Sequence, residues 1–335
     1  MRTKKSAIIT AVGAYVPETV FSNHDIEQLV ATNDEWIVAR TGIKERRIQS
    51  EKDKATSDMI VPAILEICRK RNLDPQEIEC VIVATITPDY KLPATANIVC
   101  EKIGAVNAWG FDINSACSGF IHALNIGASF IENGKHDKVI VVGADKMSSI
   151  INRQDRNTVV LFGDGAGAVL LESSTEQIGV MDSMFRSEGA GKEFLHIKSG
   201  GALNSLTVES VMANEHFVSQ DGKNIFKAAV RNMSGISKEL MKRNDLDVAD
   251  IDWFVPHQAN LRIIEAVAKE LEMPMERIKI NIEKYGNTTA GTIPICLWEL
   301  EKKLKKNDSV LLTAFGAGFS WGAVWIKWAY DPCQN

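Results

Sequence analysis

The sequence lacks the features that mark several whole classes of protein. No stretch approaches the roughly 18 uninterrupted apolar residues that a membrane-spanning helix needs. The apolar run at residues 7–16 follows a positively charged N-terminus, but it is too short and too broken by glycine for a convincing signal peptide. We therefore expect a cytoplasmic protein with no membrane association.

Cysteine pairs and excess positive charge are also missing. The six cysteines show neither a C-x-x-C pair nor the spacing of metal ligands, so we expect reduced thiols rather than disulfide bonds or a zinc site. The formal net charge of −5 gives no reason to expect nucleic acid as a partner. No low-complexity segment or flexible linker divides the chain.

The composition is otherwise that of an ordinary globular protein. Of the 335 residues, 45% are apolar and 24% are charged, and this length is typical of about two domains. Near-continuous apolar runs, which are typical of buried strands, alternate with stretches of helical periodicity. The alternation predicts an α/β protein.

The second half of the chain repeats the order of the first, which is strand, helix, strand, turn, helix, strand. Ile82 to Cys117 spans 35 positions, and Phe254 to Asn287 spans 33. The elements of the two units are predicted at residues 81–85, 94–104, 108–113, 120–131 and 138–144, and at 252–257, 260–272, 277–282, 293–304 and 309–315.

This duplication predicts two packed halves related by a pseudo-twofold axis. We place them at residues 1–175 and 176–335, with one rigid core between them. Ligands in such sheets bind outside the carboxyl ends of the strands, so the loops at the strand ends should converge on one site.

Cys117 stands where a strand is expected to turn into a helix. An apolar run ends at Ile113, and a helical pattern begins at Phe120. The first turn of a helix offers unpaired N–H groups and partial positive charge, so we expect a lowered pKa and a nucleophilic thiol. A lone cysteine among small residues is more often a buried apolar side chain, and the rest of the chain must decide between these interpretations.

Two further residues are expected near Cys117, in the loops that converge at the strand ends. His257 follows a strand in VPHQANLRII, and Asn287 lies in EKYGNTTAG; each taken alone has a structural interpretation. A fourth loop, FGAGFSWG at residues 315–322, follows the last strand. Its small residues let backbone N–H groups reach a ligand, as an oxyanion hole requires.

Two other motifs have competing interpretations. Trp36 lies among basic residues in NDEWIVARTGIKERRI, which could stack a base and pair with phosphates, or form a solvated basic face around one packed tryptophan. The run GDGAG at residues 163–167 matches neither phosphate-binding pattern, so we interpret it as small residues that allow close packing.

Six motifs together resemble the β-ketoacyl-acyl-carrier-protein synthase III family, the initiating condensing enzymes of dissociated bacterial fatty acid synthesis. They are DEWIVARTGI, SACSGF, LFGDGAGAVLLE, VPHQANLRII, EKYGNTTAG and FGAGFSWGA, and the resemblance runs from residue 7 to residue 328. It implies the thiolase fold, with two duplicated halves in a layered α-β-α-β-α arrangement, usually as a homodimer. It also implies no metal or redox cofactor, because CoA thioesters are the substrates.

The resemblance implies roles for the clustered residues. Cys117 matches the family nucleophile, which takes a short acyl group from acyl-CoA as an enzyme thioester. His257 and Asn287 match the pair that donates hydrogen bonds to malonyl-acyl carrier protein as CO2 leaves. The backbone N–H groups of Cys117 and Ala317 would hold the acyl carbonyl, and Ala317 stands where some relatives have glycine.

Contacts to substrate and carrier are implied in the same way. The family residues that bind CoA are matched by Trp36, Arg40, Arg156, Gly222, Phe226 and Asn260. Those that meet the acyl carrier protein are matched by Gln258, Ala259, Asn260, Leu261 and Arg262, with Lys227 and Lys269 as further basic contacts. Glu265 and Glu270 depart from the more basic helix of some relatives, so docking could be weaker or use other lysines.

The primer remains open at this point. Leu92, in KLPATAN, stands where a relative places a phenylalanine that closes the acyl pocket from the partner subunit. The smaller side chain predicts that longer or branched primers are accepted.

Three alternatives stand beside this assignment. A related enzyme of secondary metabolism would keep the same three residues but use another primer or acceptor. A 3-hydroxy-3-methylglutaryl-CoA synthase is disfavoured, because it uses a glutamate where the Asn287 motif is that of decarboxylating synthases. A non-catalytic module that binds acyl carriers has no need of Cys117, His257 and Asn287 together.

Overall fold

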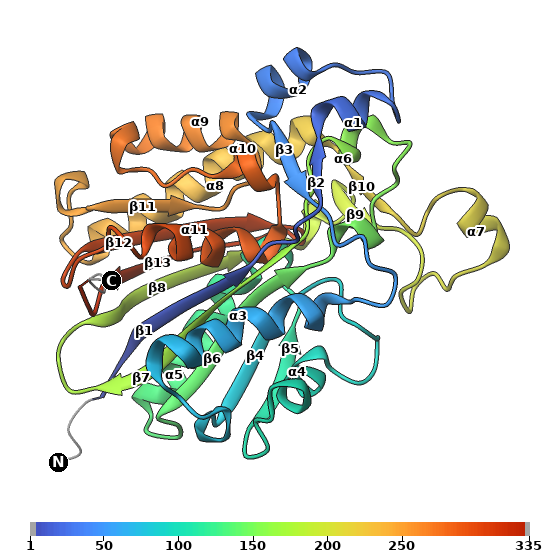
Figure 1. Ribbon diagram of the computed structural model, residues 1–335. Coiled ribbons are helices and arrows are strands. Elements are labelled where there is room, and N and C mark those ends of the chain that lie inside the picture. Colours follow the sequence, from blue (N-terminus) through green and yellow to red (C-terminus); the bar gives the residue numbers. More distant parts are fainter. Residues whose placement is uncertain (1–4, 332–335) are drawn as a thin grey trace.

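The computed structural model describes residues 5–331, and two sheets form its frame (Figure 1). The first sheet has five strands. The pairs β1–β7 and β7–β6 are antiparallel, whereas β6–β4 and β4–β5 are parallel. In spatial order the strands are β1 (Ser6–Tyr15), β7 (Gly165–Ser174), β6 (Lys138–Asp145), β4 (Cys80–Ala84) and β5 (Trp109–Ile113).

The second sheet has four strands and repeats the same sequence of pairings. The contacts β8–β13 and β13–β12 are antiparallel, and β12–β11 is parallel. The predicted duplication is therefore present in the topology, while the boundary at residue 175 stays a prediction. In spatial order the strands are β8 (Gly179–Ser187), β13 (Ser320–Lys327), β12 (Ser309–Gly316) and β11 (Trp253–Pro256).

Six helices complete a five-layered α-β-α-β-α arrangement, as predicted (Figure 1). Side chains of the two middle helices share one apolar core with the inner faces of both sheets, and each outer pair packs on one outer face. The middle layer is α5 (Gly119–Glu132) and α11 (Thr292–Leu300), and the outer pairs are α3 (Thr56–Arg71) with α4 (Thr95–Ile103), and α8 (Gly222–Arg243) with α9 (Leu261–Leu271).

The strands are apolar on both faces because both faces are covered. In β4, Ile82 faces the middle layer while Val81 and Val83 face α3 and α4. In β12, Leu312 and Leu311 divide in the same way. Successive side chains of a strand point to opposite faces, so strands buried on both sides read as the continuous apolar runs seen in the sequence.

Shorter elements surround this frame. Ser22 caps α1, and an arm carrying α7 projects from the body of the molecule (Figure 1). The helices are α1 (Asn23–Glu27), α2 (Asp34–Thr41), α6 (Arg156–Val159), α7 (Val208–Met212) and α10 (Ile282–Tyr285). The small strand pairs are β2 (Val20–Ser22) with β3 (Glu45–Arg47), and β9 (Leu195–Ile197) with β10 (Val218–Gln220). Single 3-10 turns lie at Pro75–Glu77, Met147–Ser149, Gly189–Gly191 and Val248–Asp250.

The strand predicted at residues 277–282 is wrong. A 3-10 turn at Met275–Arg277 ends where the segment begins, and Ile282 already starts α10; between them lies one isolated parallel bridge, from Ile278 to Phe254. The segment lies beside β11 as β5 lies beside β4, so the position in the duplicated sheet is kept while the ladder is lost.

A side chain takes the place of that ladder. Pro256 has no N–H to donate, and the amide of Gln258 donates to the carbonyl oxygens of Pro256 (2.7 Å) and Lys279 (3.2 Å). Its oxygen accepts the N–H of Asn281 at 3.1 Å. The alternating apolar pattern of this segment carried no sign of such an inserted amide.

The GDGAG run serves close packing, as predicted. A Cβ added to Gly167 would lie 2.7 Å from the Cβ of Pro294, and one added to Gly165 would lie 3.0 Å from the side chain of Ile295. Small residues on β7 therefore let α11 approach the sheet.

Within residues 5–331, no helix is both long enough and apolar enough to cross a bilayer. The five cysteines of this range are free and buried; Cys333 lies outside the described residues. No group of three potential metal ligands occurs among the described side chains.

Candidate active site

Cys117 lies in the turn between β5 and α5, as the sequence predicts. A 3-10 turn, η2 (Ala116–Ser118), connects the strand to the helix, and Ala116 has a φ of +45°. The side chain of Cys117 is 8% exposed. The local sequence favours this course because small residues fit the narrow space: a Cβ on Gly119 would lie 3.0 Å from the Cβ of Ala84.

The expected lowering of the Cys117 pKa is wrong. Burial raises the pKa of this thiol to about 12, and the nearby Asp145 adds to the rise. Only the hydrogen bond from its own backbone N–H acts in the other direction. Removing water from a thiolate outweighs one short helical turn, so Cys117 rests as a thiol.

Asn287 is fixed through both its backbone and its side chain. Its N–H donates to the carbonyl of Leu161 (2.8 Å), and its carbonyl accepts the N–H of Gly163 (3.1 Å). Its side-chain oxygen accepts the N–H of Thr289 at 2.8 Å. Because that donor requires an oxygen, the NH2 group is left to donate to a ligand.

His257 directly follows β11 and is 2% exposed. Its backbone N–H donates to the carbonyl of Thr313 (2.8 Å), and its ring Nδ1 lies 2.7 Å from the hydroxyl oxygen of Thr292. Burial lowers the pKa of the imidazole to about 3. His257 is therefore neutral at neutral pH.

The two halves build the same turn before their middle helices. Residues 114–119 (NSACSG) and 287–292 (NTTAGT) each place a left-handed residue third, with φ of +45° and +50°. Asn287 thus occupies the position of Asn114, three residues before that of Cys117. The compared spacings, Ile82 to Cys117 and Phe254 to Asn287, therefore end at positions that differ by three residues in the turn.

Asp145, which the sequence analysis did not single out, ties these turns together. Its buried carboxylate accepts hydrogen bonds from the hydroxyls of Thr85 (2.9 Å), Thr87 (3.0 Å) and Thr289, and from the N–H of Ile86 (2.8 Å). The contact to Thr289 holds the residue that in turn orients Asn287. An acidic residue ending the buried run KVIVVGAD was the available signal.

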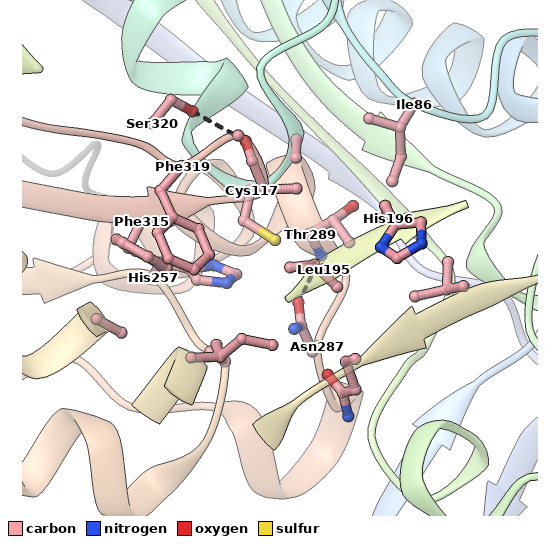
Figure 2. Close-up of a pocket in the computed structure, with 18 of the residues that line it drawn as sticks. Ile86, Cys117, Leu195, His196, His257, Asn287, Thr289, Phe315, Phe319 and Ser320 are labelled. Atoms are coloured by element: carbon pink, nitrogen blue, oxygen red, sulfur yellow. Dashed lines mark hydrogen bonds between the residues drawn. The ribbon is translucent and has the colours of Figure 1, made fainter. Parts of the chain in front are cut away.

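Cys117, His257 and Asn287 line one cavity of about 710 Å³. Figure 2 shows the sulfur, the imidazole and the carboxamide pointing toward a common space. Ala317 lines the same cavity, so the structure brings together all four residues that the sequence placed at the mouth. The lining is otherwise mainly apolar and includes Ile86, Met147, Leu195, Val218 and Phe315.

The loop after β12 is joined to the turn of Cys117 by hydroxyl groups. Ser320 Oγ lies 2.7 Å from Ser118 Oγ and 3.1 Å from Ser115 Oγ. Ser118 Oγ also donates to the carbonyl of Ser115 at 2.8 Å. The backbone amides of Cys117 and Ala317 therefore belong to two loops that are held together.

A second cleft of about 800 Å³ lies outside the first cavity and contains Trp36, Arg40 and Arg156. The guanidinium carbon of Arg156 is 3.9 Å from the centre of the Trp36 ring. Gly222, Phe226 and Asn260 line both hollows, so the two lie next to each other. Each of the six residues expected to contact CoA lines at least one of the two hollows.

Gln258, expected at the surface that meets the carrier protein, is buried. Gln258 is 0% exposed and serves the structural role described above, so its side chain does not reach a partner. Ala259, Asn260 and Leu261 are half-buried. The basic side chains are exposed: Arg262 and Lys227 line the outer cleft, whereas Lys269 lies about two turns further along α9.

Leu92 does not line the cavity of its own chain. It is 87% exposed on the loop between β4 and α4. Within one chain other apolar residues line the cavity, among them Ile86, Met147 and Val218.

Comparison with known proteins gives the family. The model described as 3-oxoacyl-[acyl-carrier-protein] synthase III matches residues 111–189, and the model of its C-terminal part matches residues 241–328. The β-ketoacyl-[acyl-carrier-protein] synthase III 1 of Bacteroides thetaiotaomicron is 51% identical over 332 residues, 99% of this chain and 99% of that protein. This chain belongs to the β-ketoacyl-acyl-carrier-protein synthase III family. A family member from Chlorobaculum tepidum is 50% identical over 96% of this chain and 99% of its own length.

Solved structures agree with this family assignment. The 3-oxoacyl-[acyl-carrier-protein] synthase III of Aquifex aeolicus has a TM-score of 0.89 and 41% identity, covering 96% of this chain and 100% of that one. The priming β-ketosynthase of the R1128 polyketide pathway has a TM-score of 0.91 and 31% identity, covering 99% of both chains. The predicted thiolase fold is confirmed, and family membership makes the chain an acyltransferase of the condensing type.

Proposed function

We propose that this chain condenses a short acyl-CoA with malonyl-acyl carrier protein, giving 3-oxoacyl-acyl carrier protein, CoA and CO2, and so starts type II fatty acid synthesis. The observation that carries the proposal is that Cys117, His257 and Asn287 line one cavity, which shares lining residues with the cleft of Trp36 and Arg156. Both substrates react as thioesters, so the reaction needs no metal or redox cofactor. A cytoplasmic location, where thiols stay reduced, belongs to this proposal.

The first half-reaction is acyl transfer to Cys117. The sulfur attacks the thioester carbon of acyl-CoA as the thiol loses its proton, and the C–S bond to CoA breaks, so that CoA leaves and takes up a proton. The N–H groups of Cys117 and Ala317 are proposed to hold the carbonyl oxygen. Support comes from the cavity, which both residues line.

The second half-reaction is decarboxylation and carbon–carbon bond formation. We assign His257 and Asn287 as donors to the thioester oxygen of the malonyl group. As CO2 leaves, the electrons of the broken C–C bond form an enolate, which attacks the acyl carbon; the C–S bond to Cys117 breaks, and the released sulfur takes up a proton from solvent. Loss of one donor to such an oxyanion costs about 3–4 kcal/mol of transition-state stabilisation.

The nucleotide end of CoA is assigned to the outer cleft. A base can stack between Trp36 and Arg156 only if Arg156 moves aside, because its guanidinium lies over that face of the indole at 3.9 Å. The proposed sandwich of adenine between the two side chains therefore forms on binding. Arg40, which is exposed at the same cleft, is placed to meet a phosphate or the pantetheine arm.

The carrier protein is assigned to the basic rim of this cleft. Arg262, Lys227 and Lys223 line it with exposed side chains, which suit an acidic partner. Lys269 extends the rim, although Glu265 and Glu270 on the same helix reduce its positive charge. Raising the salt concentration is expected to raise the KM for the carrier substrate.

We also assign this chain to a homodimer. The edge strand β5 is unpaired on one side, and Trp109 on it is 48% exposed. The loop between β4 and α4 exposes apolar side chains to water: Tyr90 is 64% exposed and Leu92 is 87% exposed. Lys91, between them, donates to the carbonyl of Gly200 on the arm. We propose that a second copy covers this loop, and that Leu92 packs against the apolar residues that line the cavity of that second copy.

A ketosynthase of secondary metabolism is the second candidate. It is favoured by the similarity to the R1128 priming enzyme, whose fold and length match this chain throughout. A panel of acetyl-, butyryl-, isobutyryl- and hexanoyl-CoA separates the two candidates. Fast acylation by acetyl-CoA or a branched short primer supports fatty acid synthesis, whereas a strong preference for hexanoyl-CoA favours the second candidate.

The direct test of the proposal is intact-protein mass spectrometry after mixing with each acyl-CoA. A mass increase equal to one acyl group, lost in Cys117→Ala, is the expected result. No acylation by any member of the panel, or acylation that persists in Cys117→Ala, would refute the assignment of the nucleophile.

A further inference from the structure

Thr292 contacts the inner ring nitrogen of His257. The distance from its hydroxyl oxygen to Nδ1 is 2.7 Å, and both side chains are only 2% exposed. Because Nδ1 is taken by Thr292, Nε2 is the nitrogen left for a ligand. Figure 2 shows the ring of His257 reaching the cavity beside Cys117 and Asn287.

The hydroxyl of Thr292 lies between two acceptors. One is Nδ1 of His257, and the other is the carbonyl oxygen of Thr289, at 2.9 Å. A hydroxyl has one proton, and a neutral imidazole has one N–H. If the hydroxyl donates to Nδ1, the ring proton is on Nε2 and faces the cavity; if it donates to Thr289, the ring proton is on Nδ1 and a lone pair faces the cavity.

The carbonyl of Thr289 does not depend on this hydroxyl. It already accepts the backbone N–H of Thr292. The hydroxyl can therefore turn to Nδ1 without leaving a buried carbonyl unpaired, which would be costly. Nδ1 of His257, in contrast, has Thr292 as its side-chain partner.

We infer that Thr292 sets the tautomer of His257: its hydroxyl donates to Nδ1, which keeps the ring proton on Nε2 as a donor to the malonyl thioester oxygen. Thr292 is a positioning residue, since it acts through His257. The inference rests on the proposed function. A carboxylate at this position would instead hold the proton on Nδ1 and make Nε2 a base. A neutral hydroxyl, on a ring that burial keeps uncharged, is the partner that a donor requires.

The test compares Thr292→Val with Thr292→Ser. Valine keeps the shape of the buried side chain without a hydroxyl, and serine restores the hydroxyl. Thr288→Val is the matched control, because it removes a buried hydroxyl from the same turn. The partner of His257 Nδ1 is Thr292 and not Thr288. Each variant is assayed for acylation by acetyl-CoA and for decarboxylation of malonyl-CoA.

The kcat for decarboxylation is expected to fall about 10- to 100-fold in Thr292→Val with KM within about threefold of wild type, and to fall far more than acylation does. Thr292→Ser and Thr288→Val should stay within about threefold of wild type. Decarboxylation by Thr292→Val at the wild-type rate, or an equal loss in Thr292→Ser, overturns the inference.

A second measurement does not depend on the variants. In wild-type protein with ¹⁵N-labelled histidine, bound to an analogue of malonyl-CoA that has an amide in place of the thioester, NMR should show the proton of His257 on Nε2. A proton on Nδ1 overturns the inference. Failure of wild type to become acylated or to decarboxylate malonyl-CoA would instead count against the proposed function, and the NMR result would still decide the tautomer.

Discussion

Gly316 lies directly against the backbone of Cys117. A Cβ placed on Gly316 would be 2.9 Å from the nitrogen of Cys117 and 2.9 Å from the carbonyl oxygen of Ser115. These are backbone atoms, so they cannot turn aside as a side chain can. The loop of one half therefore touches the nucleophile turn of the other, and only glycine fits between them.

Gly316→Ala is expected to damage acylation more than folding. The added methyl group pushes the loop of Ala317 away from Cys117, which should slow acylation by acetyl-CoA about 100-fold. Overpacking should lower the free energy of unfolding by about 1–3 kcal/mol. Rapid-quench mass spectrometry measures the first effect and urea titration the second. Gly201→Ala, where a Cβ meets nothing within 4 Å, is the control; acylation of Gly316→Ala at the control's rate would contradict this account.

Acylation should accelerate steeply with pH. The pKa of Cys117 is raised to about 12 by burial and by Asp145, so the thiol is the resting form at pH 7. The thiolate fraction, and with it the rate of acylation at saturating acetyl-CoA, should then increase roughly tenfold per pH unit between pH 7 and pH 9. A rate that already levels off near pH 7 would show that the thiolate is stabilised by something other than the described surroundings.

Trp36→Ala should weaken CoA binding without changing the chemistry. Loss of one stacking surface is worth about 1–3 kcal/mol, so the KM for acetyl-CoA should increase about 10- to 100-fold while kcat stays within about twofold. Acetyl-pantetheine, which lacks the nucleotide, is the matched substrate. An equal loss with both substrates would mean that Trp36 supports the fold of the cleft instead of binding the base.

Much of the fold and of the site could be predicted because local patterns determine them. Apolar runs gave the strands buried on both faces, and the turn after Ile113 gave the place of Cys117. The duplicated order brought His257 and Asn287 to the same mouth. These inferences need only periodicity, turn chemistry and the rule that strand ends converge.

The remaining features depend on tertiary contacts that a sequence does not display. Burial reversed the expected shift of the Cys117 pKa, and the inserted amide of Gln258 replaced a predicted strand. The hydrogen bond between Thr289 and Asp145, and the contact between Thr292 and His257, each join residues far apart in the chain. In each case the surroundings of a polar group depend on residues that are distant from it in the sequence.

Removing the imidazole of His257 should make the protein less sensitive to acid. The native pKa of about 3 is below the value of 6.5 for the unfolded chain, so below pH 6.5 the unfolded state binds a proton that the native state does not. Wild type should therefore lose about 2 kcal/mol more stability than His257→Gln between pH 7 and pH 5. Urea unfolding of both proteins at the two pH values measures the difference. Equal losses would mean that His257 is protonated in the native state.

In this one cavity the thiol of Cys117 serves acyl transfer, whereas the two neutral donors, His257 and Asn287, serve decarboxylation. Intact-mass acylation by acetyl-CoA and decarboxylation of malonyl-CoA, measured side by side on Cys117→Ala, His257→Ala and Asn287→Ala, test this division of roles most directly. Cys117→Ala should take up no acetyl group, whereas His257→Ala and Asn287→Ala should still be acetylated but lose about 10²-fold or more in decarboxylation. Loss of acetylation in either donor variant while decarboxylation survives would contradict the account.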